Sequence, residues 1–448
     1  MGCVMGNALD SLAADLRTSL ERTPLVEIAG RVTDVSPASI RVEGLSPFVG
    51  LGDVVHFRGT DAGEIGEVVR VERKAAIVKP FGAHPAIRLG QAARRVGPFT
   101  VAPHPSWKGR ILNALAEPLD GRGPLQPGPV LRPTEQNPPA ALDRGRVTAP
   151  LRTGIKVLDI FCPICAGQRI GIFAGSGVGK STMLAMLAGS RGFDTVVIAL
   201  VGERGREVRE FLEDSLGENR ARTVTVVATG DESPMMRRLS PKLATTIAES
   251  FRDAGENVLL IVDSVTRYAH AARDVALAAG EPALARGYPP SVFSELPKLL
   301  ERSGPGPQGS GSITGVFSVL VDGDDHNDPV ADAIRGTLDG HIVLDRRIAA
   351  QARYPAVDVL ASLSRLAHQA WTPEQRTLVT RLREMVARFE DTRDLRAMGG
   401  YQSGADAELD QAVAMVPRIY QALGQSPQAG RSEDAFRDLA TALQPKGK

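Results

Sequence analysis

The chain alternates between apolar runs and amphipathic segments from about residue 150 onward. The apolar runs are short and rich in Val, Ile, Leu and Ala, as buried strands are. Between two of them, residues 242–254 have helical spacing. Strands that alternate with helices predict a parallel sheet covered by helices on both faces. The predicted strands are residues 170–174, 195–201, 222–227, 257–262 and 313–321.

The pattern before this region is different. Between residues 26 and 96, apolar residues occur in short β-rich runs that glycines interrupt, which predicts a small β-barrel or sandwich. Prolines then crowd residues 118–139. Because each proline fixes φ and lacks an N–H donor, we expect no regular structure there, only an extended linker wrapped on the next domain.

Helical periodicity marks the start of the chain. Leu9, Leu12, Leu16 and Leu20 share one face of an amphipathic helix predicted for residues 5–22. A helix this short is marginal alone in water. We therefore expect it to dock on its own chain, on a partner or on a membrane surface.

Helical periodicity returns near the other end. Thr372 precedes a predicted helix that runs to Arg388, and further helices are predicted for residues 406–423 and 433–443. The predicted fold class is α/β, with a β-barrel before the parallel sheet and helices after it. The predicted domains are an N-terminal helix (1–24), a β-barrel (25–98), a proline-rich linker (99–150), an α/β domain (151–370) and a helical domain (371–448).

Residues 169–183 place a glycine-rich loop between a predicted strand and a helix. Glycines there let backbone N–H groups point into one concavity at a helix N-terminus, which favours phosphate. In this pattern the lysine reaches the β- and γ-phosphates and the next hydroxyl binds Mg²⁺. The sequence therefore predicts a site for ATP or GTP with Mg²⁺, although Ala174 replaces the first glycine of the strict pattern. The candidate residues are Gly175, Ser176, Gly177, Val178, Gly179, Lys180, Ser181 and Thr182.

Two other predicted strands end in charged residues. The run 258–263 ends at Asp263, and in phosphate-loop enzymes an Asp at this position orders the Mg²⁺ shell. Another run is followed by Glu203 and Arg204, at the carboxyl edge where such sheets bind ligands. A carboxylate there fits the group that orients or deprotonates an attacking water. The alternative is that residues 203–207 form only a solvated charged turn.

Charge, hydropathy and cysteine content disfavour several classes of protein. With 53 basic and 52 acidic residues, the net charge of +1 argues against a chain that mainly coats nucleic acid. No apolar stretch reaches the length of a membrane span and no signal sequence opens the chain, so we expect a cytoplasmic protein. Cys162 and Cys165 have C-x-x-C spacing, but a second pair is lacking, and we interpret them as buried apolar residues.

Several segments have specific residue orders: Gly-Glu-Arg-Gly-Arg-Glu-Val at 202–208, Gly-Tyr-Pro-Pro-Ser-Val-Phe-Ser-Glu-Leu-Pro at 287–297, and Tyr-Pro-Ala-Val-Asp at 354–358. With them, the chain resembles the rotary-type hexameric ATPases, which include F- and V-type catalytic subunits, the Rho helicase and type III secretion ATPases. The resemblance covers about residues 25–425. It implies a six-membered ring in which a β-barrel crown, a RecA-like nucleotide domain and a helical domain stack along the axis.

The resemblance also implies a role for each matching residue. Glu203 corresponds to the catalytic carboxylate, a position where non-catalytic members carry Gln. Tyr354 corresponds to the aromatic that stacks on adenine, and Arg365 to the arginine finger that reaches the neighbouring subunit's site. Because one chain holds both base and finger, a homohexamer suffices. The remaining implied roles are γ-phosphate contacts for Arg204 and Arg267, and Mg²⁺ coordination for Ser181, Asp263 and, in an outer position, Glu207.

Ala174 and Ser181 resemble the type III export branch, since F-type β subunits carry Gly and Thr there. Taken as a whole, the amino-acid sequence of the matching segments favours a flagellar ATPase that energises protein unfolding and export. A virulence injectisome ATPase is the alternative. A Rho-like RNA translocase is a further alternative, which the few aromatic residues before residue 100 disfavour. A purely structural nucleotide-binding subunit is disfavoured by Glu203.

The same resemblance implies the partners of the chain. They are a stator-like regulator on the N-terminal helix, a central stalk-like coiled coil in the ring, a membrane export gate, and complexes of export chaperones with their substrates. No specific nucleic acid is expected. The implied location is the cytoplasm, in peripheral association with an inner-membrane export apparatus.

Overall fold

A computed structural model describes residues 26–59, 63–83, 85–321 and 328–444. The chain forms two compact units, Met1–Phe99 and Thr100–Lys448. The helix predicted for residues 5–22 lies outside the described residues. The finer divisions predicted inside the second unit stay predictions.

The first unit is a closed antiparallel barrel, which decides between the two β architectures that the sequence allowed. The strand order is β1-β2-β5-β4-β3-β6, and β1 closes the barrel by pairing with β6. Apolar side chains such as Val42, Val55 and Phe57 fill its core and are fully buried. The strands are β1 (Ala29–Val35), β2 (Ile40–Glu43), β3 (Asp53–Phe57), β4 (Ile65–Val71), β5 (Ala75–Pro80) and β6 (Ala92–Pro98).

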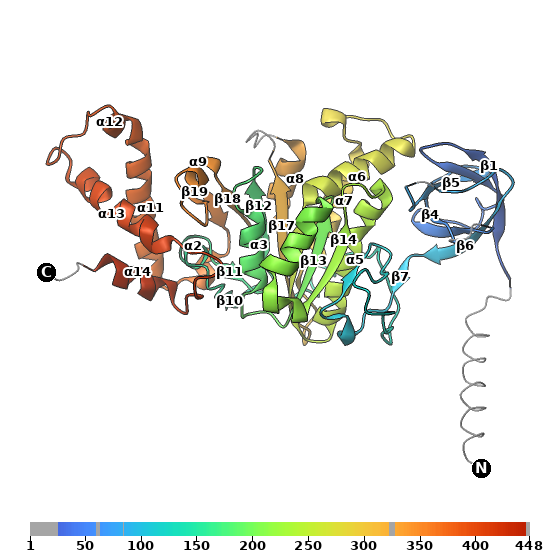
Figure 1. The fold of residues 1–448 in the computed structure, drawn as a ribbon, viewed down its shortest axis with the longest axis horizontal. Coiled ribbons are helices and arrows are strands. Elements are labelled where there is room, and N and C mark those ends of the chain that lie inside the picture. Colours follow the sequence, from blue (N-terminus) through green and yellow to red (C-terminus); the bar gives the residue numbers. More distant parts are fainter. Residues whose placement is uncertain (1–25, 60–62, 84, 322–327, 445–448) are drawn as a thin grey trace, which may run out of the picture. The chain divides into compact units, whose positions relative to one another are not determined.

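The second unit is built on a nine-stranded sheet with the order β19-β18-β12-β17-β15-β13-β14-β8, to which β16 adds alongside β17 (Figure 1). Its central strands run parallel, as predicted, and only β19 and β16 pair antiparallel. All five predicted strands are present, with ends within one residue of the prediction. Their bounds are β12 (Arg169–Ala174), β13 (Thr195–Val201), β14 (Thr223–Ala228), β15 (Asn257–Asp263) and β17 (Ser312–Leu320), beside β16 (Gly304–Pro305), β18 (Gly340–Leu344) and β19 (Val357–Ser364).

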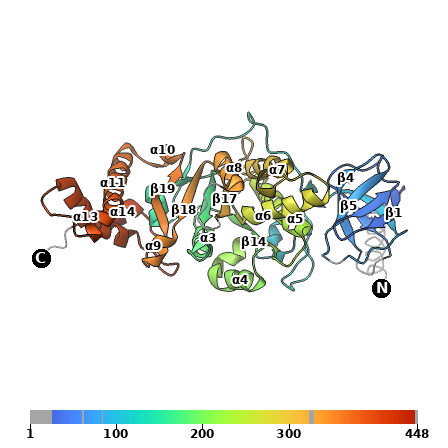
Figure 2. The same cartoon turned by 90° about the horizontal axis from the view of Figure 1, so that it is seen from above.

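Helices cover both faces of this sheet, so β13 is buried along its whole length. Figure 2 shows α3 and α4 on one side and α5 to α8 on the other. Helix α5 is longer than predicted and starts at Pro234, because Ser233 caps its first turn by accepting a hydrogen bond from Met236 N. The bounds are α2 (Lys156–Phe161), α3 (Lys180–Ala188), α4 (Gly205–Glu210), α5 (Pro234–Asp253), α6 (Val265–Ala278), α7 (Pro290–Glu301), α8 (Pro329–Thr337) and α9 (Arg346–Ala350).

The proline-rich segment and the residues before it contribute short pieces of regular structure. Strand β8 (Ile111–Leu112) pairs with β14 at the edge of the sheet, and β7 (Thr100–Val101) pairs with β9 (Arg132–Pro133). The expectation of no regular structure is therefore wrong at β9. A two-residue pairing tolerates the proline because it needs few backbone donors.

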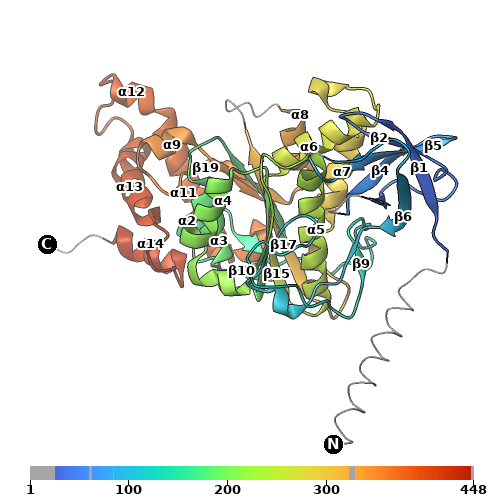
Figure 3. The same cartoon turned by 45° about the vertical axis from the view of Figure 1, so that its right-hand side comes forward.

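The predicted C-terminal helices are confirmed, and they gather beside the β19 edge of the sheet (Figure 1 and Figure 3). Thr372 and Gln375 form a capping box at the start of the helix Pro373–Asp391, where the sequence predicts a cap. The helices are α10 (Ala367–Ala370), α11 (Pro373–Asp391), α12 (Arg393–Ala397), α13 (Ala407–Leu423) and α14 (Ala435–Leu443).

Candidate active site

The glycine-rich loop connects β12 to α3 at the carboxyl edge of the sheet. Gly177 and Gly179 have φ of 79° and 92°, in the left-handed region that side chains disfavour. Gly179 caps α3 without any side-chain hydrogen bond, so the helix's first N–H groups lack a side-chain acceptor there. Space is open around Gly177, where a Cβ would have no atom within 4 Å. The loop therefore fits an anion such as a polyphosphate.

Lys180 is the first residue of α3 and lies between two carboxylates. Its Nζ is 2.5 Å from Oδ1 of Asp263 and 3.3 Å from Oε1 of Glu203. Burial alone would lower the pKa of the Lys180 ammonium, but the two carboxylates raise it above its usual value. Lys180 is therefore a fixed cation beside the loop, and the structure brings together three residues that the sequence predicts for one site.

Glu203 follows β13 and is 9% exposed. Burial raises the pKa of its carboxyl, against the opposing effects of Lys180 and Arg267. Arg267, on α6, approaches Glu203 Oε2 to 3.7 Å and donates a hydrogen bond to the carbonyl of Gly202. A Cβ at Gly202 would lie 2.7 Å from Cδ of Arg267, so only glycine admits this close approach. Glu203 is thus a confined carboxylate with a raised pKa, as a general base requires.

Ser318 is part of this cluster, although it belongs to none of the motifs that predicted the site. It lies on β17, which separates β12 from β15, and its hydroxyl donates to Oδ1 of Asp263 at 2.8 Å. The available signal was a hydroxyl residue near the carboxyl end of a buried strand, inside the apolar run from Val316 to Leu320. Ser318 fixes the orientation of the same oxygen that contacts Lys180.

Arg204 and Glu207 lie on the solvent side of the site. Arg204 is the N-cap residue of α4, and its side chain pairs with Glu207 at 3.4 Å. The side chains are 79% and 40% exposed. The structure does not bring them into contact with Lys180, so their predicted roles stay predictions.

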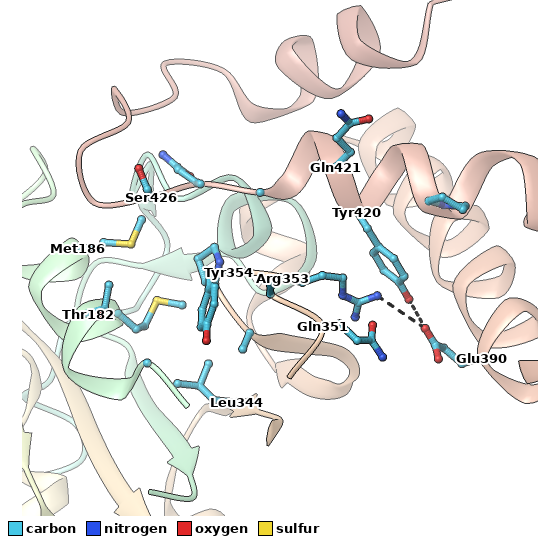
Figure 4. A pocket seen from close by; sticks show the side chains of 18 of the residues that line it. Thr182, Met186, Leu344, Gln351, Arg353, Tyr354, Glu390, Tyr420, Gln421 and Ser426 are labelled. Carbon is cyan, nitrogen blue, oxygen red and sulfur yellow. Dashed lines mark hydrogen bonds and ion pairs between the residues drawn. The ribbon is translucent and has the colours of Figure 1, made fainter. Parts of the chain in front are cut away.

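Tyr354 lies beside the glycine-rich loop, next to Gly179. Its ring carbons would lie 3.7 Å from a Cβ at Gly179, and its side chain is 48% exposed. Tyr354, Thr182 and Met186 line a cavity of about 980 Å³ that also reaches α11 and α13 (Figure 4). The ring lies beside the loop and is half exposed, and its predicted role in stacking on adenine stays a prediction.

Arg365 lies at the end of the sheet opposite the glycine-rich loop. Strand β19 runs antiparallel to β18, so its end, Ser364, pairs with Gly340 at the start of β18. The glycine-rich loop follows the other end of β12, and six residues of strand span about 20 Å. The exposed Arg365 therefore lies far from the loop of its own chain.

Comparisons with known proteins agree with this geometry. Residues 154–364 match the ATP synthase alpha/beta family, nucleotide-binding domain, and residues 371–441 match the T3SS EscN ATPase C-terminal domain. The chain is 58% identical over 414 residues to the flagellum-specific ATP synthase of Rhizobium meliloti, with 92% of this chain and 89% of the relative covered. It is 42% identical to the type 3 secretion system ATPase of Xanthomonas euvesicatoria, with 96% and 98% covered.

Solved structures of type III secretion ATPases are also similar to this chain. The assembled ATPase EscN of the enteropathogenic E. coli type III secretion system superimposes with a TM-score of 0.85 at 37% identity, covering 92% of this chain and 98% of that one. EscN in complex with its central stalk EscO gives 0.84, with 92% and 99% covered. Within the described residues, none of the helices has the length and apolarity needed to cross a membrane. The chain belongs to the family of flagellum-specific ATP synthases and type III secretion ATPases.

Proposed function

We propose that this chain hydrolyses ATP in a homohexameric ring and thereby energises protein export through a flagellar type III apparatus. The observation that carries the ATPase assignment is the contact of Lys180 with both Asp263 and Glu203 beside the glycine-rich loop. The 58% and 44% identities to flagellum-specific ATP synthases of Rhizobium meliloti and Caulobacter vibrioides support the flagellar assignment.

The residues present fit ATP with Mg²⁺. The loop N–H groups and Lys180 would hold the phosphates, and Tyr354 would stack on the base. The hydroxyl of Ser181 and the carboxylate of Asp263 would hold Mg²⁺, with Glu207 in an outer position; when bound, the ion neutralises charge on the phosphates. Few protein ligands suffice, because Mg²⁺ keeps waters and takes phosphate oxygens.

Glu203 would accept the proton of the attacking water. Its raised pKa makes it a better base than an ordinary carboxylate, provided that it is ionised. Arg267 contacts both Glu203 and the Gly202 carbonyl, so it would orient the base, and it would also contact the γ-phosphate. Arg204, the exposed N-cap residue of α4, would add a second such contact.

The placement of Arg365 supports the ring. A finger at the end of the sheet opposite its own loop serves catalysis only in the site of a neighbour. The assembled state of EscN supports the same arrangement, and its complex with the stalk EscO supports a central stalk-like partner. The stator-like regulator, the membrane export gate and the chaperone–substrate complexes are further parts of this proposal, as is a peripheral location at the inner membrane.

The injectisome ATPase is the second candidate, which the structural match to EscN favours. An RNA translocase gains no support from the barrel. Of its aromatic side chains, Phe57 and Phe81 are buried, and Phe48 is 53% exposed. A stacking platform for bases requires several exposed rings.

Cells that carry Glu203→Gln test the proposal. We expect a marked loss of motility and of flagellar protein secretion, while secretion of effectors continues. Glu210→Gln, an exposed carboxylate of α4 paired with Arg206, is the matched control and should leave both unchanged. Normal swimming with abolished effector secretion would move the assignment to the injectisome, and normal behaviour in both would refute export.

A further inference from the structure

We propose that Arg353, Glu390 and Tyr420, named here the base clamp, position Tyr354 for the nucleotide base. This inference rests on the proposed function, because it concerns how the same site recognises ATP. The three residues would act through Tyr354 and would not touch the phosphates. They come from the loop after α9 and from the C-terminal helices α11 and α13, far apart in the sequence.

The base clamp is a compact set of polar and aromatic contacts. The guanidinium carbon of Arg353 lies 3.6 Å from the centre of the Tyr420 ring. The Tyr420 hydroxyl donates to Oε1 of Glu390 at 2.7 Å, and Nη1 of Arg353 approaches the same oxygen to 4.0 Å. Burial raises the pKa of Tyr420, so its hydroxyl stays protonated and remains a donor. Each member thus contacts the other two.

Arg353 and Tyr354 are neighbours in sequence but point to different partners. In Figure 4 the Arg353 side chain extends toward Glu390 and Tyr420, while the Tyr354 ring extends toward Leu344. Both contribute to the wall of the same cavity. Because consecutive side chains share one short stretch of backbone, fixing Arg353 restricts the orientations open to Tyr354.

The backbone around Tyr354 requires such support. Ala352 has a φ of 55°, in the left-handed region that is unfavourable for alanine. On the other side, the Tyr354 carbonyl accepts a hydrogen bond of 2.9 Å from the backbone N–H of Gln425. The base clamp therefore secures the loop beside the strained residue, and Gln425 secures it at Tyr354 itself.

The phosphate site depends on other contacts. Lys180 is held by Asp263 and Glu203, neither of which touches the base clamp. Loosening the base clamp should therefore weaken recognition of the base and leave recognition of the phosphates unchanged. That separation distinguishes a positioning role from a general contribution to folding.

The experiment uses the full chain with the variant Arg353→Gln. Dissociation constants for ADP are measured directly, and Mg²⁺-tripolyphosphate, which has phosphates but no base, is the second ligand. We expect ADP affinity and the KM for ATP to weaken by about tenfold, with kcat within about twofold and tripolyphosphate affinity unchanged. Tyr420→Phe keeps the ring under Arg353 and loses only the hydroxyl, so it should show a smaller effect in the same direction.

Arg388→Gln is the matched control. Arg388 also joins α11 to the start of α13, through Asp406 at 2.9 Å, but has no contact with the Tyr354 loop. This variant should leave the affinities for ADP and tripolyphosphate and the KM for ATP unchanged. Equal losses in Arg388→Gln, a parallel loss of tripolyphosphate and ADP binding, or unchanged ADP binding in Arg353→Gln would each overturn the inference. A wild-type chain that binds ADP but hydrolyses no ATP would refute the proposed function and leave this comparison intact.

Discussion

The ammonium of Lys180 lies 2.5 Å from the carboxylate of Asp263, although 83 positions separate the two residues. They meet because β12 and β15 run parallel with only β17 between them, so both strands end at one edge of the sheet. Ser318, on the strand between them, donates to the same oxygen of Asp263. The cation that would hold phosphate is therefore fixed by the fold and shared with both acidic residues of the site.

Removing this cation should impair binding as well as turnover. Lys180→Ala leaves Asp263 and Glu203 buried without their main partner, and it deletes the charge that attracts phosphate. We expect ATP affinity to fall by at least about tenfold and hydrolysis to be lost. Calorimetric titration with ATP and a phosphate-release assay measure the two effects. Retained affinity would contradict the assignment of Lys180.

Replacing the base should separate binding from turnover. Glu203→Gln is nearly isosteric and leaves the Lys180–Asp263 contact in place. We expect ATP affinity to be kept while turnover falls below about a tenth of the wild-type rate, because only proton acceptance is lost. Faster hydrolysis than this would show that another group activates the water.

The finger assignment predicts complementation between two inactive chains. Arg365→Ala alone should lower kcat on the order of 10³-fold without unfolding the protein. In rings that mix Arg365→Ala with Glu203→Gln subunits, some interfaces hold an intact base and an intact finger. Hydrolysis should therefore partly recover. If mixed rings stay as inactive as either parent, Arg365 does not act in trans.

Glu295 predicts a pH-dependent stability. Burial alone would raise the pKa of Glu295, but Lys242 and Arg238 lower it to about 2. Arg238 contacts Glu295 at 2.7 Å, and the Tyr268 hydroxyl donates to it at 3.1 Å. A depressed carboxyl pKa stabilises the fold above the unfolded value of 4.5, and this contribution disappears as the pH falls from 4.5 toward 2.

Glu295→Gln should therefore destabilise the fold at pH 7 by on the order of 3 kcal/mol. The difference from wild type should narrow at pH 4, where the unfolded wild-type side chain is largely protonated. Thermal unfolding at both pH values measures it. A difference that stays constant or widens at pH 4 would contradict the depressed pKa.

The predicted N-terminal helix is tested by truncation. Its apolar stripe comprises Leu9, Leu12, Leu16 and Leu20. Deleting residues 1–20 should leave ATP binding and hydrolysis intact and abolish association with a regulatory partner or a membrane surface. Aggregation of the shortened chain, or loss of ATP binding, would indicate instead that the helix packs on its own chain.

Local sequence patterns determined much of this protein. Periodicity predicted β12, β13, β14, β15 and β17, because buried parallel strands must be continuously apolar. The glycine-rich loop predicted the phosphate site, since its chemistry lies within consecutive residues. Thr372 predicted the start of α11 for the same reason, as a helix cap depends on neighbours three residues away.

Only the tertiary structure decided what distant residues do together. It closed the barrel by pairing β1 with β6, and it brought Ser318 to Asp263. It also set Arg353 against Tyr420, which lies 67 positions later in the chain. Periodicity reports which face of an element is buried, but not which strand lies beside it. Contacts between distant segments arise from strand order and helix packing, so the base clamp became visible only in the folded chain.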